Sequence, residues 1–267
     1  MKAHIDKRIY HVEILPPKQD SQKLEADLEL FASKYEQVMA DGLCACITDN
    51  AMGWPSFQAT ELIEELGLEV KPEQLLVHLN SFHSREGLDG ILDSCEKLGI
   101  RYLLTVTGDG SERFAKLDPA ELGFDGLQSV TSVELLRYIE KRHPGRFEMG
   151  VAFNPYEPED HECAKLKRKI DAGAKFIITQ PIIESHPLAD KLLATCELPV
   201  ILECWMSRKL YLLSECVGYP IPEDTEYDPL ACLATLHRNY PQCGMYLALL
   251  GFKSQYHLIS DSWPLRG

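Results

Sequence analysis

The chain has 267 residues, of which 45% are hydrophobic and 25% charged, a composition typical of one ordinary globular domain. Its formal net charge of −14 at pH 7 argues against nucleic acid as a partner, because surfaces that bind nucleic acid are basic. The sequence contains no apolar run long enough to span a membrane, and the N-terminal MKAHIDKRIYHVEI lacks the apolar core of a signal peptide. We therefore expect a cytoplasmic protein.

Short apolar runs bounded by turn residues predict eight strands, over His11–Leu15, Leu43–Thr48, Leu75–Asn80, Tyr102–Thr107, Phe147–Phe153, Lys175–Gln180, Val200–Trp205 and Met245–Leu250. Helical patterns lie between them, over Ser21–Ala40, Phe57–Leu66, Arg85–Leu98, Ser132–Lys141, Pro158–Ala172, Leu188–Thr195 and Leu230–Arg238. This alternation favours α/β architecture with a closed (β/α)8 TIM barrel, which typically needs about 250 residues, as a single domain over residues 1–267. A doubly wound open sheet is the alternative, but no G-x-G-x-x-G follows the first strand.

The segment KLKRKIDAGAKFIITQ, from Lys165 to Gln180, shows the repeating unit most clearly. Gly173 fits the left-handed turn that ends a helix, and the following FII has the apolar character of a parallel strand covered on both faces. Gln180 ends that strand without a packing reason to be there. In a repeated βα fold this position faces the active site.

Polar residues stand at the ends of other predicted strands as well. Glu13 lies inside the apolar run HVEIL, where burial would raise its pKa and suit it to hold a proton as a general acid; a structural ion pair is the alternative. The other candidates are Thr48, His78, Thr107, Gly108, Asp109 and Asn154. Each is weak evidence alone, but their convergence on one rim predicts a ligand site.

Two irregular stretches, Gly110–Thr131 and Val217–Pro229, interrupt the βα pattern. Long loops of this kind commonly form the walls of a ligand site, and plain surface loops are the alternative.

The nine cysteines are odd in number and scattered, which in a cytosolic chain predicts buried, reduced thiols. We expect the side chains of Cys44 and Cys46 to diverge to opposite faces of their strand, and no second ligand pair lies at zinc spacing. The sequence therefore predicts no metal site.

The chain resembles the catalytic barrel of the methylenetetrahydrofolate reductase family. The matching motifs cover roughly the first two thirds in family order and are VEILPPK (12–18), ITDNA (47–51), VHLNS (77–81), GIRYLLTVTGD (99–109), GVAFNP (150–155) and LKRKIDAGAKFIITQ (166–180). Beyond residue 199 the match is thinner, although LPVILECWM occupies the place of the family's seventh strand.

The resemblance implies a reductase that converts 5,10-methylene-tetrahydrofolate to 5-methyl-tetrahydrofolate with hydride from NADH or NADPH, generally through FAD. Glu13 corresponds to the acid that protonates the departing nitrogen, Asp109 to the carboxylate that binds the pterin and stabilises its cationic character, and Gln180 to the amide that orients the pterin edge. The implied partner is a small-molecule folate. The sequence does not give the oligomeric state, but barrels of this family usually associate, which leaves a homo-oligomer open.

The resemblance also implies a set of cofactor-binding residues: Thr48, His78, Thr107, Gly108, Asn154, Arg168 and Lys169. Thr107 and Asn154 depart from the arginine and tyrosine common in flavin-binding members, and threonine cannot replace an arginine's charge-assisted pair with a pyrophosphate. Bound FAD and direct hydride transfer from the nicotinamide therefore both stay open. For Arg168 and Lys169, the helix dipole alone would also favour cations at a helix end.

Two other functions fit the same residues. One is a related one-carbon enzyme that oxidises a methyl-folate, because the sequence does not give the physiological direction. The other is a folate-binding subunit without reductase activity, against which the retained Glu13, Asp109 and Gln180 argue.

Overall fold

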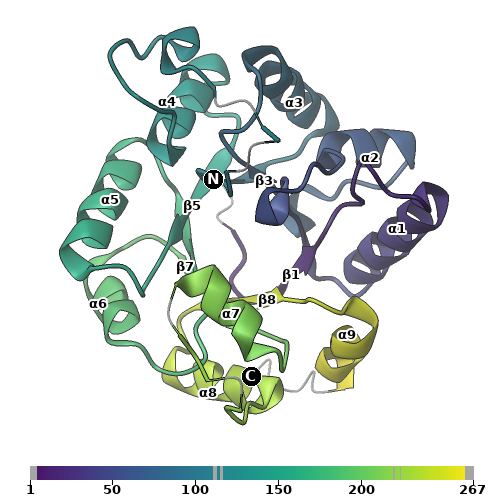
Figure 1. The fold of residues 1–267 in the computed structure, drawn as a ribbon, viewed down its shortest axis with the longest axis vertical. Helices are drawn as coiled ribbons and strands as arrows, with labels where there is room; N and C mark the ends of the chain where they lie inside the picture. Colours follow the sequence, from purple (N-terminus) through teal and green to yellow (C-terminus); the bar gives the residue numbers. More distant parts are fainter. Residues whose placement is uncertain (1–4, 111–112, 115–116, 219, 223, 262–267) are drawn as a thin grey trace.

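Eight parallel strands close into a barrel in sequence order (Figure 1). The computed structural model describes residues 5–110, 113–114, 117–218, 220–222 and 224–261. The strands are β1 (His11–Ile14), β2 (Cys44–Ile47), β3 (Leu75–Leu79), β4 (Tyr102–Thr105), β5 (Glu148–Phe153), β6 (Phe176–Thr179), β7 (Val200–Trp205) and β8 (Gly244–Ala248). The barrel closes where β8 pairs with β1, with Tyr246 opposite His11. The predicted TIM barrel is confirmed, and each strand ends within two residues of its prediction.

Helices surround the barrel (Figure 1). They are α1 (Leu24–Ala40), α2 (Ala59–Glu65), α3 (Arg85–Leu98), α4 (Ser132–Arg142), α5 (Glu159–Asp171), α6 (Pro187–Thr195), α7 (Leu210–Val217), α8 (Pro229–Asn239) and α9 (Phe252–Asp261), with short 3-10 turns η1 (Ala51–Gly53), η2 (Pro72–Gln74) and η3 (Pro119–Leu122). Among the described helices, none has the length and apolarity needed to cross a bilayer.

The sequence prediction missed α7 and α9. Helix α7 reads LYLLSECV, with apolar residues on most of its surface rather than on one stripe, so it lacks the helical periodicity on which the prediction relied. Its Leu210 and Leu213 pack with Trp205 and Ala248, at the carboxyl ends of β7 and β8. This short helix therefore covers one side of the barrel mouth, as the green ribbon in Figure 1 shows.

The barrel interior has its own packed core, separate from the layer between strands and helices. Its members include Cys44, Cys46, Leu76, Tyr102, Leu104, Phe176, Ile178, Ile201 and Tyr246. Gly150 makes room for the Phe176 ring, because a Cβ at Gly150 would lie 2.1 Å from that ring. Gly173 adopts φ +112°, which confirms the predicted left-handed turn before β6.

The prediction that Cys44 and Cys46 diverge is wrong. Their sulfur atoms lie 4.0 Å apart inside the barrel, because residues two apart on a strand share a face and only neighbouring residues alternate. The eight cysteines whose side chains the structure describes are free thiols, most of them buried. Within the described residues, no group of three or more His, Cys, Asp or Glu side chains could hold a metal ion.

Candidate active site

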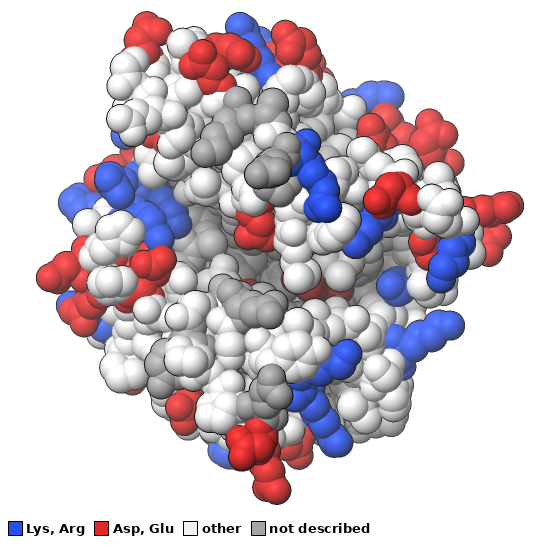
Figure 2. Space-filling view, in the orientation of Figure 1, with Lys and Arg blue, Asp and Glu red and all other residues white. Residues whose placement is uncertain are grey.

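A cavity of about 730 Å³ opens at the carboxyl ends of the strands. Every site residue predicted from the sequence lines it, namely Glu13, Thr48, His78, Thr107, Gly108, Asp109, Asn154, Arg168, Lys169 and Gln180. Figure 2 shows the same face of the molecule hollowed near its centre. The barrel thus brings together residues that lie up to 167 positions apart in the chain, from Glu13 to Gln180.

Glu13 lies at the floor of this cavity, next to the packed interior of the barrel. The Tyr246 hydroxyl donates a hydrogen bond of 3.2 Å to Oε2 of Glu13, and lies 3.3 Å from Nε2 of His78. Removal from water raises the pKa of Glu13 to about 7, against the lowering effect of the Tyr246 hydrogen bond. The same removal lowers the pKa of His78 to about 4, so the imidazole is neutral at pH 7. Glu13 can therefore hold a proton and release it near neutral pH.

Glu203 is another carboxyl group that lines the cavity, and the sequence interpretation missed it. Glu203 lies on β7 directly opposite Tyr246 of β8. Burial, and then the negative charge of Glu13, raise the pKa of Glu203 well above its ordinary value. The signal that identified Glu13, a carboxylate inside an apolar strand, is present again in VILECW and could have identified Glu203.

Asp109 occupies the rim, where its Oδ2 accepts a 2.9 Å hydrogen bond from the backbone N–H of Met52. Just after β2, the buried carboxylate of Asp49 accepts a hydrogen bond from the backbone N–H of Asn80 at 2.8 Å and contacts Nε2 of His83 at 2.7 Å. Asp49 thereby ties together the loops that follow β2 and β3. The rim that carries Asp109 is held in place before any ligand binds.

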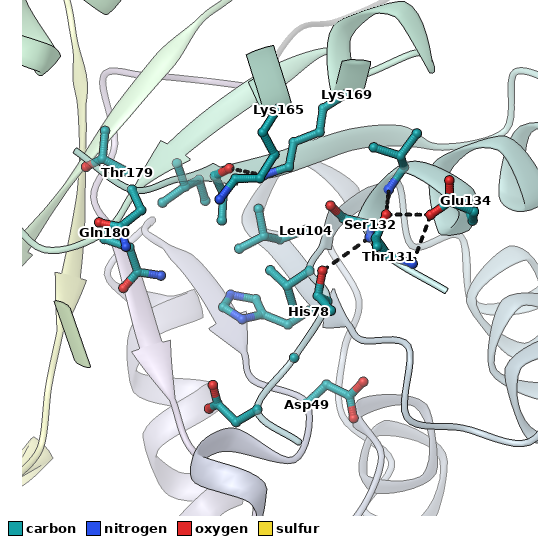
Figure 3. A pocket seen from close by; sticks show the side chains of 18 of the residues that line it. Asp49, His78, Leu104, Thr131, Ser132, Glu134, Lys165, Lys169, Thr179 and Gln180 are labelled. Atoms are coloured by element: carbon teal, nitrogen blue, oxygen red, sulfur yellow. Dashed lines mark hydrogen bonds between the residues drawn. The ribbon is translucent and has the colours of Figure 1, made fainter. Parts of the chain in front are cut away.

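Gln180 follows β6, and its backbone N–H donates a 2.7 Å hydrogen bond to the Phe153 carbonyl. No described residue makes a hydrogen bond with its side-chain amide, which therefore offers both a donor and an acceptor to a ligand. Figure 3 shows Gln180 and the His78 ring bordering the same space.

Thr48 presents another polar group without a protein partner. Its Oγ1 is buried, lines the cavity, and has no hydrogen-bond partner among the described residues. Buried hydroxyls are normally bonded, so this one is suited to a ligand. Thr107, in contrast, is already engaged, since its Oγ1 accepts a 3.3 Å hydrogen bond from the N–H of Ser132 at the start of α4.

Cations form the wall of the cavity that α4 and α5 supply. Arg137 of α4 and Lys165, Arg168 and Lys169 of α5 all line the cavity, and Figure 2 shows blue side chains gathered over α5. Lys165 pairs with the buried Glu162. Lys169 donates a 2.6 Å hydrogen bond to the Ala152 carbonyl, and burial lowers its pKa to about 8. Figure 3 shows Lys165 and Lys169 extending from α5 toward the cavity.

Arg137 and Arg168 are both exposed, and neither forms an ion pair with a described residue. They leave positive charge available for an anionic ligand, despite the net charge of −14 on the whole chain. Arg137 and Lys165 were not among the predicted site residues.

The Asn154 side chain is engaged within its own loop, where its Oδ1 accepts a 3.0 Å hydrogen bond from the N–H of Tyr156.

The two irregular stretches differ in their relation to the cavity. Residues 127–129 of Gly110–Thr131 form part of its wall; residues 111–112 and 115–116 of that stretch lie outside the described residues. The described part of Val217–Pro229 does not line the cavity.

Comparison with known families gives a match that covers most of the chain. The family described as methylenetetrahydrofolate reductase matches residues 1–197. Methylenetetrahydrofolate reductase (NADH) 1 of Zea mays is 26% identical over 187 residues, which are 64% of this chain and 30% of the maize protein. Methylenetetrahydrofolate reductase 1 of Schizosaccharomyces pombe is 27% identical over 183 residues, 66% of this chain and 28% of that protein. The match thus spans less than a third of the length of these relatives.

Solved structures share the fold. An uncharacterized protein from Clostridium thermocellum, which binds two copies of 5-methyl-5,6,7,8-tetrahydrofolic acid, aligns with a TM-score of 0.61 at 14% identity, over 97% of this chain and 93% of its own. Oxaloacetate acetylhydrolase aligns with a TM-score of 0.54 at 11% identity, over 96% and 80%. At such identities the likeness shows the barrel fold alone.

Proposed function

Because the chain belongs to the methylenetetrahydrofolate reductase family, we propose that it transfers hydride between a nicotinamide nucleotide and a folate, interconverting 5,10-methylene- and 5-methyl-tetrahydrofolate. The observation that carries this proposal is Glu13, a carboxyl group with a pKa of about 7 at the floor of a cavity large enough for a small molecule. The methyl-folate ligand of the Clostridium thermocellum protein with the same fold is consistent with a folate.

In the proposed reduction, the departing nitrogen of the methylene-folate is protonated before hydride adds to the methylene carbon. The five-membered ring of the methylene-folate opens when the bond from the methylene carbon to the departing nitrogen breaks, and that nitrogen takes the proton of Glu13. A hydride then adds to the exposed methylene carbon of the cation. The carboxylate left on Glu13 keeps the hydrogen bond from the Tyr246 hydroxyl, which limits the cost of its charge.

Gln180 and Asp109 are proposed to hold the pterin above this acid. The amide of Gln180 can donate to and accept from the pterin edge, and the Asp109 carboxylate can accept from its N–H groups. Because Asp109 already accepts the N–H of Met52, its orientation is set before the folate arrives.

The polar and cationic groups that line the rest of the cavity fit a dinucleotide, with Thr48 beside β1 and the cations on α4 and α5. The Thr48 hydroxyl suits a polar ring, and the cations of α4 and α5 suit a pyrophosphate, so Arg137 and Arg168, which form no ion pair with a described residue, supply charge that Thr107 cannot. The FAD and the nicotinamide dinucleotides that this family uses both carry a pyrophosphate, and bound FAD would supply a two-electron hydride carrier. Arg168, Lys169 and Thr48 are the residues proposed to hold either one.

The substitution Glu13→Gln tests the acid. It should lower turnover by about 10²- to 10⁴-fold, the usual contribution of a general acid, while the Kd for 5-methyl-tetrahydrofolate stays nearly unchanged. Turnover is measured in both directions with NADH and with NADPH, and folate binding by calorimetry. Glu65→Gln, an exposed carboxylate on α2, is the matched control and should change neither quantity.

Each outcome has a distinct meaning. If Glu13→Gln retains full turnover, Glu13 is not the acid. If the unaltered protein binds the folate but turns it over in neither direction, the chain is a folate-binding protein and the reductase proposal is wrong.

A further inference from the structure

Glu203 and Glu13 flank the same tyrosine at the barrel floor. Strand β8 lies between β7 and β1, so Tyr246 separates Glu203 on one side from β1 on the other. The Tyr246 hydroxyl reaches Glu13 with its 3.2 Å hydrogen bond, and both carboxyl groups line the cavity. The reductase chemistry uses Glu13 and leaves Glu203 without a role.

The described groups that face these two carboxyls supply no compensating positive charge. They are the His11 imidazole on β1, opposite Tyr246, the Cys46 thiol on β2, the His78 imidazole on β3 and the Tyr246 hydroxyl on β8, with the buried Asp49 carboxylate near His78. Burial raises the pKa of Cys46 and of Tyr246 well above their ordinary values and lowers that of His11 and of His78 to about 4, so all four are neutral at pH 7.

The described cations of the cavity stand elsewhere. Lys165, Arg168 and Lys169 belong to α5 and Arg137 to α4, and these helices follow β5 and β4, across the barrel from β8 and β1 (Figure 1). Two carboxylates in a partly dry site without a nearby cation cannot both ionise easily, because each charge opposes the other. Such a pair loses its protons in two separate steps.

We propose that Glu203 and Glu13 share a proton on either side of Tyr246, and that Glu203 thereby sets the pH range in which Glu13 acts as an acid. This rests on the reductase chemistry proposed above. When Glu13 gives its proton to the departing nitrogen, Glu203 keeps its own, and the pair carries one negative charge rather than two. At higher pH the remaining proton is distributed over both groups, so Glu13 stays partly protonated.

The pH dependence of kcat/KM for methylene-folate reduction distinguishes Glu203→Gln from the unaltered protein. Without a second titrating carboxyl, Glu13 ionises completely in one step. The alkaline loss of activity should then move to lower pH by about one unit or more, since groups that titrate as a pair differ by at least that much. Glu203→Asp restores a carboxyl and should return the alkaline limb toward its original position. If Glu203→Gln lowers kcat/KM equally at every pH and leaves the pH of the alkaline loss unchanged, Glu203 only shapes the cavity.

A readout without substrate separates this proposal from the proposed function. The infrared carbonyl stretch of a protonated carboxyl group should persist above pH 7 in the unaltered protein and should titrate at lower pH both in Glu203→Gln and in Glu13→Gln, because each change leaves one carboxyl without a charged neighbour. A band that is unchanged in Glu13→Gln would show that Glu203 holds the proton alone. If the protein has no turnover in either direction, the reductase proposal fails, but the infrared band still decides whether the proton is shared. If the band disappears from the unaltered protein near pH 4.5, the ordinary pKa of a glutamic acid side chain, the proposal that the two carboxyls share a proton is wrong.

Discussion

The Glu13 carboxyl group makes the stability of this protein depend on pH. Its pKa is about 7 in the folded chain against 4.5 ordinarily, so the folded state binds more protons than the unfolded state between these values. The ionisation of Glu13 therefore lowers stability by about 3 kcal/mol as pH rises from about 4.5 to about 7, and Glu203, whose pKa is also raised, extends the fall to higher pH.

The substitution Glu13→Gln removes the loss of stability that ionisation of this buried carboxyl causes. The substitution should raise the free energy of unfolding by up to about 3 kcal/mol at pH 8 and change it little at pH 4. Urea denaturation at the two pH values measures both. Equal effects at pH 4 and pH 8 would show that Glu13 is not held in its protonated form by burial.

Thr48 provides a second test at the level of one residue. Because no described residue bonds its buried hydroxyl, Thr48→Val should leave the thermal midpoint unchanged or raise it slightly. If the hydroxyl binds the dinucleotide, the same change should weaken nucleotide binding by about tenfold, the effect of one hydrogen bond. A clear loss of stability with unchanged nucleotide affinity would contradict this assignment.

Sequence reasoning worked for residues whose position was unusual for their type. Glu13 and Gln180 were identified because a polar side chain interrupted or ended an apolar strand, and both line the cavity. Glu203 carried the same signal and was missed, since the family resemblance is thinner over β7. Arg137 and Lys165 gave no such signal, because a charged residue on a helix is ordinarily in solvent and only the closed barrel shows which helix face borders the cavity.

At the level of elements, the packing of β5 against β6 requires glycine at position 150. A Cβ at Gly150 would lie 2.1 Å from Cε2 of Phe176, whose ring fills the barrel interior against Tyr102. Gly150→Ala should therefore destabilise the protein by about 1–3 kcal/mol or more through overpacking.

Gly90→Ala is the matched control. Gly90 lies inside α3, and a methyl group added there would have no neighbouring atom within 4 Å, so alanine should stabilise that helix by about 0.5–1 kcal/mol. Both variants are compared by denaturant unfolding. If Gly150→Ala is as stable as the unaltered protein, the barrel interior is packed less tightly than the contact between Gly150 and Phe176 indicates.

The order and boundaries of most elements followed from the spacing of apolar residues. Amphipathic helices bury apolar residues three or four positions apart, whereas the strands of the barrel bury short continuous apolar runs. Periodicity failed for α7, whose residues are apolar almost all round and which packs over the ends of β7 and β8 instead of against the outer face of the barrel. The prediction failed for the two cysteines of β2 because the face on which residues i and i+2 lie was assigned wrongly.

At the level of the whole molecule, the net charge of −14 and the cationic wall act in opposite directions on an anionic ligand. Nucleotide affinity should fall as salt rises, because salt screens the attraction between the wall and the phosphates. Arg168→Gln should weaken nucleotide binding several-fold and reduce this salt dependence, since a charge-assisted bond is lost. Arg146→Gln, on the loop before β5 and away from this cavity, should leave the salt dependence unchanged.

Isotope transfer from the nicotinamide nucleotide to the folate would demonstrate the proposed hydride transfer. The protein is incubated anaerobically with methylene-tetrahydrofolate and nicotinamide nucleotide carrying deuterium at the transferred position, with and without added FAD, and the product is analysed by mass spectrometry. We expect 5-methyl-tetrahydrofolate with deuterium in its methyl group; full retention indicates direct transfer, and partial loss to solvent indicates passage through flavin. If no methyl-folate forms under any of these conditions while folate still binds, the protein does not catalyse the proposed hydride transfer.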